Sequence, residues 1–320
     1  MRRRTIMKKY AFGADIGGTT VKLGLFTTEG ELLKKWEIPT RTGEEYDILQ
    51  DVADSCCGMM DQKNLVREDF AGIGIGVPGP VREDGSVDVC VNLGWGKKQV
   101  RDEMEAALGM PVAVGNDANV AALGEMWQGG GKGYENVVMV TLGTGVGGGI
   151  IVGGKMISGA HGYGGEIGHI FINTHETEYC NCGKRGCLEQ YASATGIVRM
   201  AKKALEASEE DSVLRKADSL TAKDVLDAAK FGDAFAVKLT EDFCRRLARG
   251  LSFVSCVTDP DIFVIGGGVS KAGSIITETV KKYFDGYVFG SQKDTKFGLA
   301  TLGNDAGIYG CAKLITETGK

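Results

Sequence analysis

The chain has 320 residues, of which 43% are hydrophobic and 25% are charged, as expected for a globular protein large enough for two packed domains. Its formal net charge of −5 provides no global basic surface for nucleic acid, and no run of about 18 apolar residues could span a membrane. The basic start is not followed by the apolar run of a secretory signal, although Met7 is an alternative start. We therefore expect a cytoplasmic protein. Nine cysteines, an odd number, indicate free thiols or a metal rather than a disulfide framework.

Taken in chain order, the first part of the sequence alternates strands with helices. The expected strands are 10–15, 21–26, 31–38, 70–77 and 112–114, and the expected helices are 44–61, 98–108 and a run from about residue 117. Strands then return at 136–142, 149–152, 155–157 and 262–265. Residues 164–189 read as a loop, and helices are expected at 192–209, 221–230, 233–258, from Ser270, and at 306–316.

Glycine is unusually frequent: it makes up 49 of the 320 residues, about 15%, against a usual share of about 7%, and it clusters at strand ends. Glycine hairpins at 17–20 and 143–148 each follow one strand and precede two more. This repeated layout predicts an internal duplication in which Asp15 corresponds to Thr141, although two unrelated hairpins would look similar. The domain boundary is expected near residue 120.

The two glycine hairpins are candidate phosphate sites, because their backbone N–H groups are unobstructed by side chains. Hydroxyl groups from Thr19, Thr20 and Thr144 add donors. Asp15 lies too close to the same site to bind phosphate itself, and a carboxylate beside phosphates usually serves Mg²⁺ or its waters. Two stretches match G-x-G-x-x-G, at 143–148 and 74–79, but neither opens a helix, so a dinucleotide site is not supported.

A strand–turn–helix junction at 112–127 carries Asn116 and Asp117. Such junctions are where open α/β sheets place their ligands. Asp117 near a helix N-terminus would stay ionised and could take a proton from a substrate hydroxyl. The alternative is that Asn116 or Asp117 is only an N-cap, the commonest task of these residue types.

Four potential metal ligands lie within 19 residues, namely His169, Cys180, Cys182 and Cys187. Three thiolates and one imidazole make a tetrahedral Zn²⁺ set, and four protein ligands leave no open position, so the zinc would be structural. The alternative is a group of buried or redox-active cysteines. The other six cysteines are scattered and are expected in the core.

Glu166 and Glu189 flank this cluster and, with His169, form a polar set suited to a polyhydroxyl ligand. If one imidazole nitrogen binds zinc, the other remains free to hydrogen-bond a substrate. Taken singly, both glutamates could be solvated loop residues. The strand at 262–265 runs into Gly266-Gly267-Gly268, where the backbone could approach a ribose or base, or form a plain strand-to-helix turn.

Four of these motifs together resemble the ROK family of repressors, open reading frames and kinases, which belongs to the actin/hexokinase-like ATPase superfamily. They are DIGGT at 15–19, LGTGVGGG at 142–149, EIGH at 166–169 and the cysteine segment 180–189. The resemblance covers about residues 10 to 316. Stretches 91–95, 115–119, 123–127 and 303–307 look most like the ATP-dependent glucokinases of Gram-positive bacteria.

The resemblance implies an α/β fold with two RNase H-like lobes around a central cleft. The N-terminal lobe would be 1–120, completed by the C-terminal helix at 303–320, and the C-terminal lobe with the zinc knuckle would be 121–302. It further implies ATP-dependent phosphorylation of glucose at the 6-hydroxyl, with Asp117 as catalytic base. Sugar-binding residues would be Gly79, Asn92, Asn116, Asp117, Glu166, His169 and Glu189. The residues for ATP and Mg²⁺ would be Asp15, Gly17, Gly18, Thr19, Thr20, Lys22, Thr144, Gly145, Gly266 and Gly267.

The resemblance also implies a homo-oligomer, either a dimer or a tetramer. No helix-turn-helix fits into the short stretch before Asp15, which speaks against a repressor, and polyphosphate-using relatives generally lack the cysteine cluster, which favours ATP as donor. Two alternatives stay open. The chain could be a kinase for another hexose (N-acetylmannosamine, N-acetylglucosamine, mannose or allose), or a sugar-sensing protein without turnover.

Overall fold

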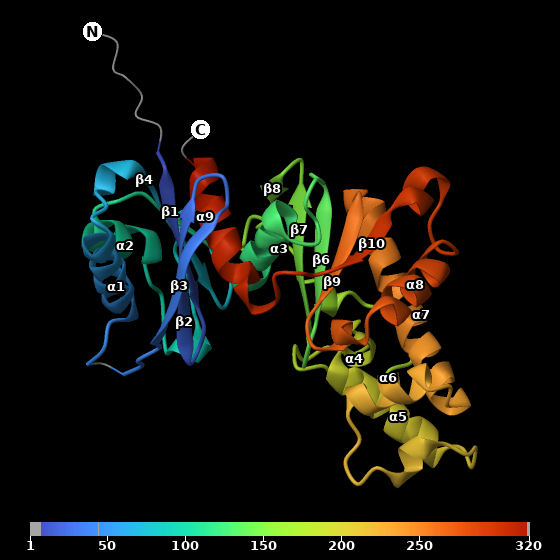
Figure 1. Cartoon of the computed structure of the whole chain (residues 1–320). Coiled ribbons are helices and arrows are strands. Elements are labelled where there is room, and N and C mark those ends of the chain that lie inside the picture. The colour runs from blue at the N-terminus through green and yellow to red at the C-terminus, as the bar shows by residue number, and fades with distance from the viewer. Residues whose placement is uncertain (1–7, 44, 319–320) are drawn as a thin grey trace. The chain divides into compact units, whose positions relative to one another are not determined.

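The computed structural model describes residues 8–43 and 45–318, and it contains two five-stranded sheets (Figure 1). Met7 and Glu44, the first residue of the helix expected at 44–61, lie outside the described residues, as do the last two residues of the expected C-terminal segment. No helix within 8–43 and 45–318 is long and apolar enough to cross a membrane.

The strands are β1 (Tyr10–Ile16), β2 (Thr20–Thr27), β3 (Leu32–Pro39), β4 (Phe70–Val77), β5 (Val112–Asn116), β6 (Val137–Leu142), β7 (Val146–Val152), β8 (Lys155–Met156), β9 (Ile262–Gly266) and β10 (Lys296–Leu299). The helices are α1 (Ile48–Lys63), α2 (Val100–Leu108), α3 (Asp117–Gln128), α4 (Glu189–Ala192), α5 (Ala194–Glu206), α6 (Ala222–Lys230), α7 (Ala234–Thr258), α8 (Ser274–Phe284) and α9 (Ala306–Thr318).

The two sheets share one strand topology. Their orders are β3-β2-β1-β4-β5 and β8-β7-β6-β9-β10, so each begins with three consecutive strands and continues with two later ones. β1 and β6 each pair antiparallel with the next strand and parallel with β4 and β9, respectively. In this register Asp15 lies opposite Gly76, and Thr141 lies opposite Gly266. The matching positions of Asp15 and Thr141 agree with the predicted duplication.

The chain divides into two compact units. The first comprises Met1–Gly133, Lys155–Gly164 and Asn304–Lys320, and the second comprises Tyr134–Gly154 and Gly165–Gly303. The boundary expected from the sequence, at residue 120, falls inside α3.

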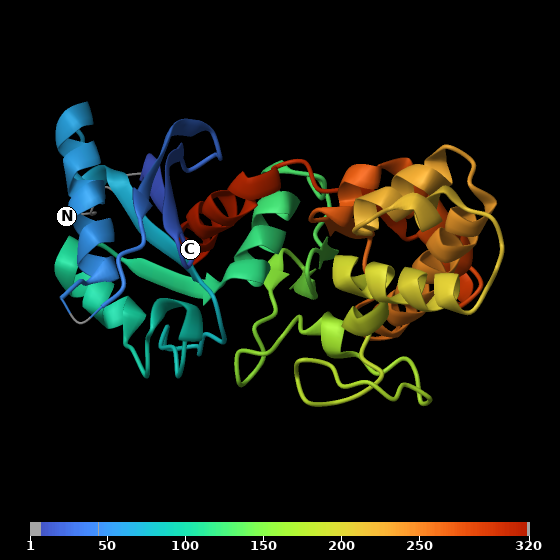
Figure 2. The same cartoon turned by 90° about the horizontal axis from the view of Figure 1, so that it is seen from below.

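In the first unit, α1 and α2 lie on one face of the sheet and α9 lies on the other (Figures 1 and 2). The core between the sheet and α1 includes the stacked rings of Phe12 and Phe70, whose centroids are 4.6 Å apart. On the other face, α3 packs along α9 at glycine contacts. A Cβ built on Gly310 would come within 1.6 Å of the Val120 carbonyl oxygen, so only glycine permits this helix pair.

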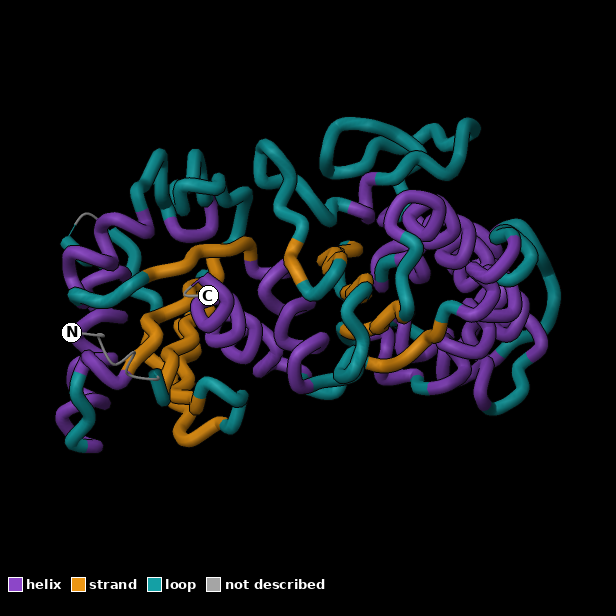
Figure 3. The backbone as a smooth tube through the Cα atoms, turned by 90° about the horizontal axis from the view of Figure 1, so that it is seen from above, coloured by secondary structure: helices purple, strands orange, loops and turns teal. Residues whose placement is uncertain are grey.

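In the second unit, the 25-residue helix α7 packs against α6 and α8. The rings of Phe263, Phe284 and Phe297 contact one another between β9, α8 and β10. The segment from Gly165 to Leu188 is mostly loop, yellow-green in Figure 2 and teal in Figure 3, as the sequence predicts for this part of the chain. The chemistry expected there therefore depends on side-chain contacts rather than on regular structure.

Some element predictions were wrong. The strand β10 was missed because its four residues show no clear alternation. The helix expected from Ser270 is a short 3₁₀ turn, and α8 begins at Ser274, because Gly273 adopts φ +82° between them. The helix expected at 192–209 is interrupted at Ser193, which is extended and caps α5 by accepting a hydrogen bond from the Gly196 N–H.

Candidate functional site

The junction between β5 and α3 brings three predicted residues together in the first unit. Asn116 is the N-cap of α3, and its Oδ1 accepts hydrogen bonds from the N–H groups of Ala118 and Asn119 at 3.0 and 3.2 Å. Its amide nitrogen donates to the Gly79 carbonyl at 3.0 Å. Asp117 is therefore not the cap but the first residue of the helix, and its side chain is exposed. The capping alternative applies to Asn116 and leaves Asp117 available for chemistry.

Asp117 is held in an environment that disfavours its negative charge. Burial by the surrounding protein is the main cause and raises the pKa of this carboxyl above its ordinary value, even though one side of the group reaches solvent. A hydrogen bond from the Ala118 N–H, at 2.7 Å, acts in the opposite direction. A carboxylate with a raised pKa is a stronger base than a free one, which suits proton abstraction.

Asp15 is the second strand-end carboxylate at this edge of the sheet. β1, β4 and β5 are parallel neighbours, so their carboxyl ends lie side by side. Asp15 is half-buried, and its pKa is raised to about 6, first by burial and then by the negative charge of Asp117, whereas Lys22 lowers it. The two carboxylates are therefore close enough to repel each other, and a cation bound beside them would relieve this repulsion.

The first glycine turn lies at the same edge. Its backbone is braced by Thr40, whose N–H donates to the Thr19 carbonyl at 2.9 Å and whose hydroxyl donates to the Gly17 carbonyl at 2.6 Å. A Cβ built on Gly18 would lie 3.5 Å from the Asn92 carbonyl oxygen, so the structure also brings Asn92 to this turn. Lys22 donates through Nζ to the Asn304 carbonyl at 3.1 Å.

The second glycine turn, Gly143–Gly145, lies in the second unit and contacts Glu189. The Val146 N–H donates to Glu189 Oε2 at 3.0 Å, and a Cβ built on Gly145 would come within 2.1 Å of the same oxygen. The Thr144 carbonyl accepts a hydrogen bond from the Thr195 hydroxyl at 2.7 Å. Glu189 is therefore a half-buried anchor for this turn rather than the solvated loop residue of the alternative interpretation.

The predicted metal ligands converge. One ligand atom from each of His169, Cys180, Cys182 and Cys187 lies within 4.8 Å of the others. The Cys182 and Cys187 sulfurs are 3.6 Å apart, close to the separation of about 3.7 Å between two sulfurs in a tetrahedral site with Zn–S bonds of about 2.3 Å. All nine cysteines, each within the described residues, are free. The chemistry and spacing of these donors fit Zn²⁺.

The two ring nitrogens of His169 face different groups. Nδ1 lies 3.9 Å from the Cys180 sulfur, and Nε2 lies 3.9 Å from Glu166 Oε2. The Glu166 side chain is 54% exposed, so it is free to contact a ligand. With Nδ1 on a metal, Nε2 would carry the proton and could donate it to a ligand oxygen beside Glu166.

Gly183 and Gly186 shape the cysteine segment. Both adopt the left-handed conformation, with φ +81° and +77°. This allows the tight turn in which the Gly183 N–H donates to the Cys180 carbonyl and the Cys180 N–H donates to the Lys184 carbonyl. The spacing of the three cysteines therefore depends on these glycines.

A cavity of about 310 Å³ in the second unit was missed by the sequence analysis. Its lining is largely apolar and comes from α6, from Ala194 and from the turn after β9, and it includes Leu226, Gly268 and Val269. Ala194 donates through its N–H to the Gly143 carbonyl, so the cavity adjoins the second glycine turn. No sequence signal indicates it, because α6 and the turn after β9 are distant in the chain and meet only in the fold.

Gly266 and Gly267 do not line this cavity. Gly266 is the buried last residue of β9. Gly267 has φ +83°, and a Cβ on it would come within 2.5 Å of the Leu142 carbonyl oxygen. Both glycines are accounted for by packing of the strand-to-helix turn, whereas Gly268 faces the cavity.

The sequence of this chain is similar to the sequences of several known proteins. The sequence matches the ROK family over residues 11–318. It is 41% identical to a glucokinase of Halalkalibacterium halodurans, over 97% of this chain and 96% of that protein. It is 32% identical to the N-acetylgalactosamine kinase AgaK of Shewanella sp. ANA-3, over 95% of this chain and 96% of that protein.

The structure is similar to a ROK family glucokinase from Streptomyces griseus, which was solved in complex with glucose and AMPPNP. The TM-score is 0.69 at 34% identity, covering 95% of this chain and 98% of that chain. These likenesses confirm the α/β fold class expected from the resemblance.

Proposed function

This chain belongs to the ROK family, and we propose that it is a glucokinase, which transfers the γ-phosphoryl group of ATP to the 6-hydroxyl of glucose. The observation that carries this proposal is the 41% identity to a glucokinase along nearly the whole of both chains. The residues described above would supply the groups that the reaction needs. They include a base, a cation-favouring edge, two phosphate turns and a polar set for hydroxyl groups.

The nucleotide is proposed to bind at the two glycine turns and the apolar cavity. Backbone N–H groups at 17–20 and 143–145 would hold phosphate oxygens. The cavity beside Gly268 has the apolar lining and the size that a purine ring needs, and it adjoins the second turn through Ala194. Asp15 would hold Mg²⁺ or its waters, and the ion would neutralise charge on the phosphates.

The sugar is proposed to contact Asn92, Gly79 and Asn116 in the first unit and Glu166, His169 and Glu189 in the second. Support comes from Asn116, whose amide is already oriented by Gly79, and from the exposed carboxylate of Glu166 beside His169 Nε2. Pairs of acceptors and donors fixed in this way discriminate between sugars by hydroxyl position, because a misplaced hydroxyl leaves a polar group unpaired.

Asp117 is proposed as the general base. Its carboxylate takes the proton of the 6-hydroxyl as the hydroxyl oxygen bonds to the γ-phosphorus and the bond from that phosphorus to the bridging oxygen breaks, releasing ADP. The exposed position at the helix start lets a substrate reach it, and its raised pKa makes it a better proton acceptor. Most of the remaining rate would come from positioning the two substrates.

We further propose that His169, Cys180, Cys182 and Cys187 hold a structural Zn²⁺. The convergence of the four donors supports this proposal. With four protein ligands, the ion has no open position for substrate, so it would orient the loop and the His169 ring rather than act on the sugar. Cytoplasmic location stays a prediction from the sequence, and a homo-oligomeric state, dimer or tetramer, stays a prediction from the family resemblance.

The proposal is tested by a panel of hexoses with ATP and Mg²⁺ in a coupled ADP-release assay, using the purified chain. We expect glucose to have the highest kcat/KM. A second candidate, a kinase for an N-acetylated hexose, is favoured by the likeness to the N-acetylgalactosamine kinase. A higher kcat/KM for N-acetylgalactosamine, N-acetylglucosamine or N-acetylmannosamine would replace glucose as substrate. Glucose binding without ADP release would instead indicate a sugar-sensing protein.

A further inference from the structure

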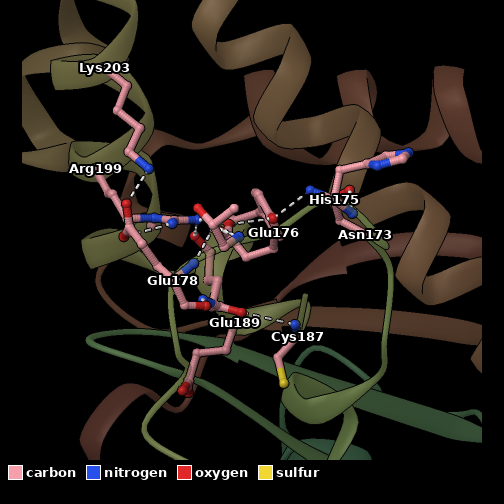
Figure 4. Close-up of polar contacts among 12 residues, drawn as sticks. Asn173, His175, Glu176, Glu178, Cys187, Glu189, Arg199 and Lys203 are labelled. Carbon is pink, nitrogen blue, oxygen red and sulfur yellow. Dashed lines mark hydrogen bonds and ion pairs between the residues drawn. The ribbon is translucent and has the colours of Figure 1, made fainter. Parts of the chain in front are cut away.

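A network of charged and aromatic side chains holds the segment 173–180, which ends at Cys180, the first of the three cysteines proposed to bind zinc. Its central side chains, those of Glu176, Tyr191 and Arg199, are not among the residues predicted from the sequence. The members come from the loop and from α4, α5 and α7, and Figure 4 shows part of the network. Just before this segment, Phe171 pairs with Cys187 through an isolated antiparallel β-bridge, so the segment is attached to the cysteine motif at both ends.

Arg199 on α5 is the centre of the network. Its guanidinium donates to Glu176 Oε2 at 2.8 Å, to Glu178 Oε2 at 3.0 Å and to the Gln190 carbonyl at 3.0 Å. Lys203, one turn further along α5, also pairs with Glu178. One cation therefore joins two loop carboxylates to the backbone of α4, as Figure 4 shows.

The Glu176 side chain is more buried than is usual for a charged group. Its side chain is only 7% exposed, and that of Arg199 is 22% exposed. The hydrogen bond from Arg199 is the main cause that lowers the pKa of Glu176 to about 2. A buried ion pair adds little net stability, because desolvation offsets attraction, but it strongly restricts geometry. The pair therefore fixes where the loop sits.

Tyr191 on α4 completes the attachment. Its hydroxyl donates to Glu176 Oε2 at 2.5 Å and accepts from the Asn173 amide at 2.7 Å. The guanidinium groups of Arg199 and Arg246 lie over its buried ring, at 5.2 and 4.6 Å from the ring centroid. Both the ring and the hydroxyl of Tyr191 are therefore held by neighbouring side chains.

Three consecutive residues of α4 face three different groups. Glu189 accepts from the Val146 N–H, Gln190 accepts from the Cys187 N–H at 3.1 Å, and Tyr191 donates to Glu176. The Gln190 amide also donates to the Glu178 carbonyl at 3.0 Å. Because α4 is only one turn long, a shift of Tyr191 would be transmitted to Glu189.

We propose that Arg199 and Tyr191 are positioning residues, which clamp segment 173–180 onto α4 and thereby set the Glu189 carboxylate and the Cys180 sulfur. The inference rests on the proposed function for its effect on sugar binding, but its effect on metal retention does not depend on that function. Among the described residues, the hydrogen bonds and ion pairs of these two side chains go to Asn173, Glu176, Glu178 and Gln190, none of which is predicted to bind sugar, so both act through the loop and α4.

The test uses the purified full chain with the variants Tyr191→Phe and Arg199→Lys. Tyr191→Phe keeps the ring beside the two arginines and removes only the hydroxyl. Arg199→Lys keeps the charge but replaces the two guanidinium nitrogens, which bond Glu178 separately from Glu176 and the Gln190 carbonyl, by a single nitrogen. Lys238→Ala, which removes an exposed ion pair with Glu210 in the same unit, is the matched control.

Three quantities are measured for each variant. They are glucose affinity by calorimetry, the KM for ATP, and the rate at which a chromogenic chelator removes zinc. We expect both variants to weaken glucose binding and to speed zinc removal by about 10-fold, the usual scale for residues behind a metal ligand, with the KM for ATP within about 2-fold of wild type. Lys238→Ala should match wild type in all three.

The proposal is overturned if folded Tyr191→Phe and Arg199→Lys both keep wild-type glucose affinity and zinc release. It is also overturned if they weaken glucose and ATP equally, since that indicates general loosening. Should wild type bind no hexose, the proposed function fails separately. Faster zinc release in both variants would then still support the clamp, and unchanged release would overturn it.

Discussion

The Asp15 carboxylate lies directly against Gly307, the second residue of α9, where a Cβ would come within 2.3 Å of Asp15 Oδ2. The C-terminal helix thus closes over the end of β1 and leaves room for no other side chain. This contact helps to bury Asp15, whose pKa of about 6 reflects that burial and the charge of Asp117.

Replacement of Asp15 by Asn should stabilise the ligand-free protein at neutral pH. The folded-state pKa of Asp15, about 6, lies above the ordinary value of 3.8 for an Asp carboxyl, so ionisation costs stability as the pH rises from about 4 to about 6. Above pH 6 the full cost is present, at most about 3 kcal/mol at 1.36 kcal/mol per pKa unit. Asp15→Asn should therefore gain about 1–3 kcal/mol at pH 7.5.

Urea unfolding of both proteins between pH 4 and pH 7.5 measures this gain, which should shrink toward zero as the pH falls to about 4. A gain that is constant with pH would show that Asp15 ionisation is not its source. The same variant should lose activity with ATP and Mg²⁺, because the carboxylate proposed to hold the ion or its waters is gone.

Asp117→Asn should abolish most turnover while leaving binding intact. An amide cannot accept the hydroxyl proton, so kcat should fall by at least about 10²-fold, the scale of general-base removal. The variant should still fold, retain zinc and bind glucose by calorimetry. In wild type, kcat/KM should fall at acid pH as Asp117 becomes protonated. Near-normal turnover in the variant would remove Asp117 from the proposed role.

The second glycine turn can be tested by two neighbouring substitutions. A Cβ on Gly143 would meet no atom within 4 Å, so Gly143→Ala should leave thermal stability unchanged. If a phosphate approaches this backbone, the added methyl group should raise the KM for ATP by about 10-fold or more, since a lost charge-assisted hydrogen bond costs about 1.5–3 kcal/mol. An unchanged KM for ATP would place the phosphates elsewhere.

Gly145→Ala is the contrasting variant. Its Cβ would collide with Glu189 Oε2 at 2.1 Å and displace the carboxylate from the Val146 N–H. We expect it to weaken glucose binding as well as ATP binding, because Glu189 is assigned to the sugar. Calorimetry with each ligand separates the two effects.

Two glycine-to-alanine changes, one where α9 packs against α3 and one on the exposed face of α1, should have opposite effects on stability. Gly310→Ala would place its Cβ 1.6 Å from the Val120 carbonyl oxygen and should force the helices apart, at a cost of about 1–3 kcal/mol or more, as for overpacked cores. Gly58→Ala, on the exposed face of α1 with no atom within 4 Å, should stabilise by about 0.5–1 kcal/mol. Chemical unfolding of both variants checks the signs.

Removal of two of the proposed zinc ligands should weaken sugar binding and leave nucleotide binding almost unchanged. Cys180→Ser combined with Cys182→Ser should lose zinc, as measured by metal analysis of the purified protein, and should weaken glucose binding. Binding of an ATP analogue should change little. Unchanged glucose affinity in the zinc-free variant would mean that the cysteine segment 180–189 does not hold Glu166, His169 and Glu189 in place.

Local patterns were sufficient for the strand-end motifs. The turn after β1, the β5–α3 junction and the cysteine spacing are each encoded within about twenty residues, and the structure forms all of them. The cavity beside Gly268 and the strand β10 were missed. Each depends on segments that are distant in sequence and too short to have a periodic signal of their own.

By itself, the sequence determined which residue types stand at the ends of the strands and that four potential metal ligands lie close together along the chain, because turns and short ligand spacings are local properties. Only the tertiary structure decided that Asn116 rather than Asp117 caps α3, that Glu189 holds the second glycine turn, and that Arg199 joins the loop at 173–180 to α4. The Glu189 and Arg199 contacts join distant segments, and the Asn116 side chain that caps α3 also bonds the distant Gly79 carbonyl, so no local pattern contains them.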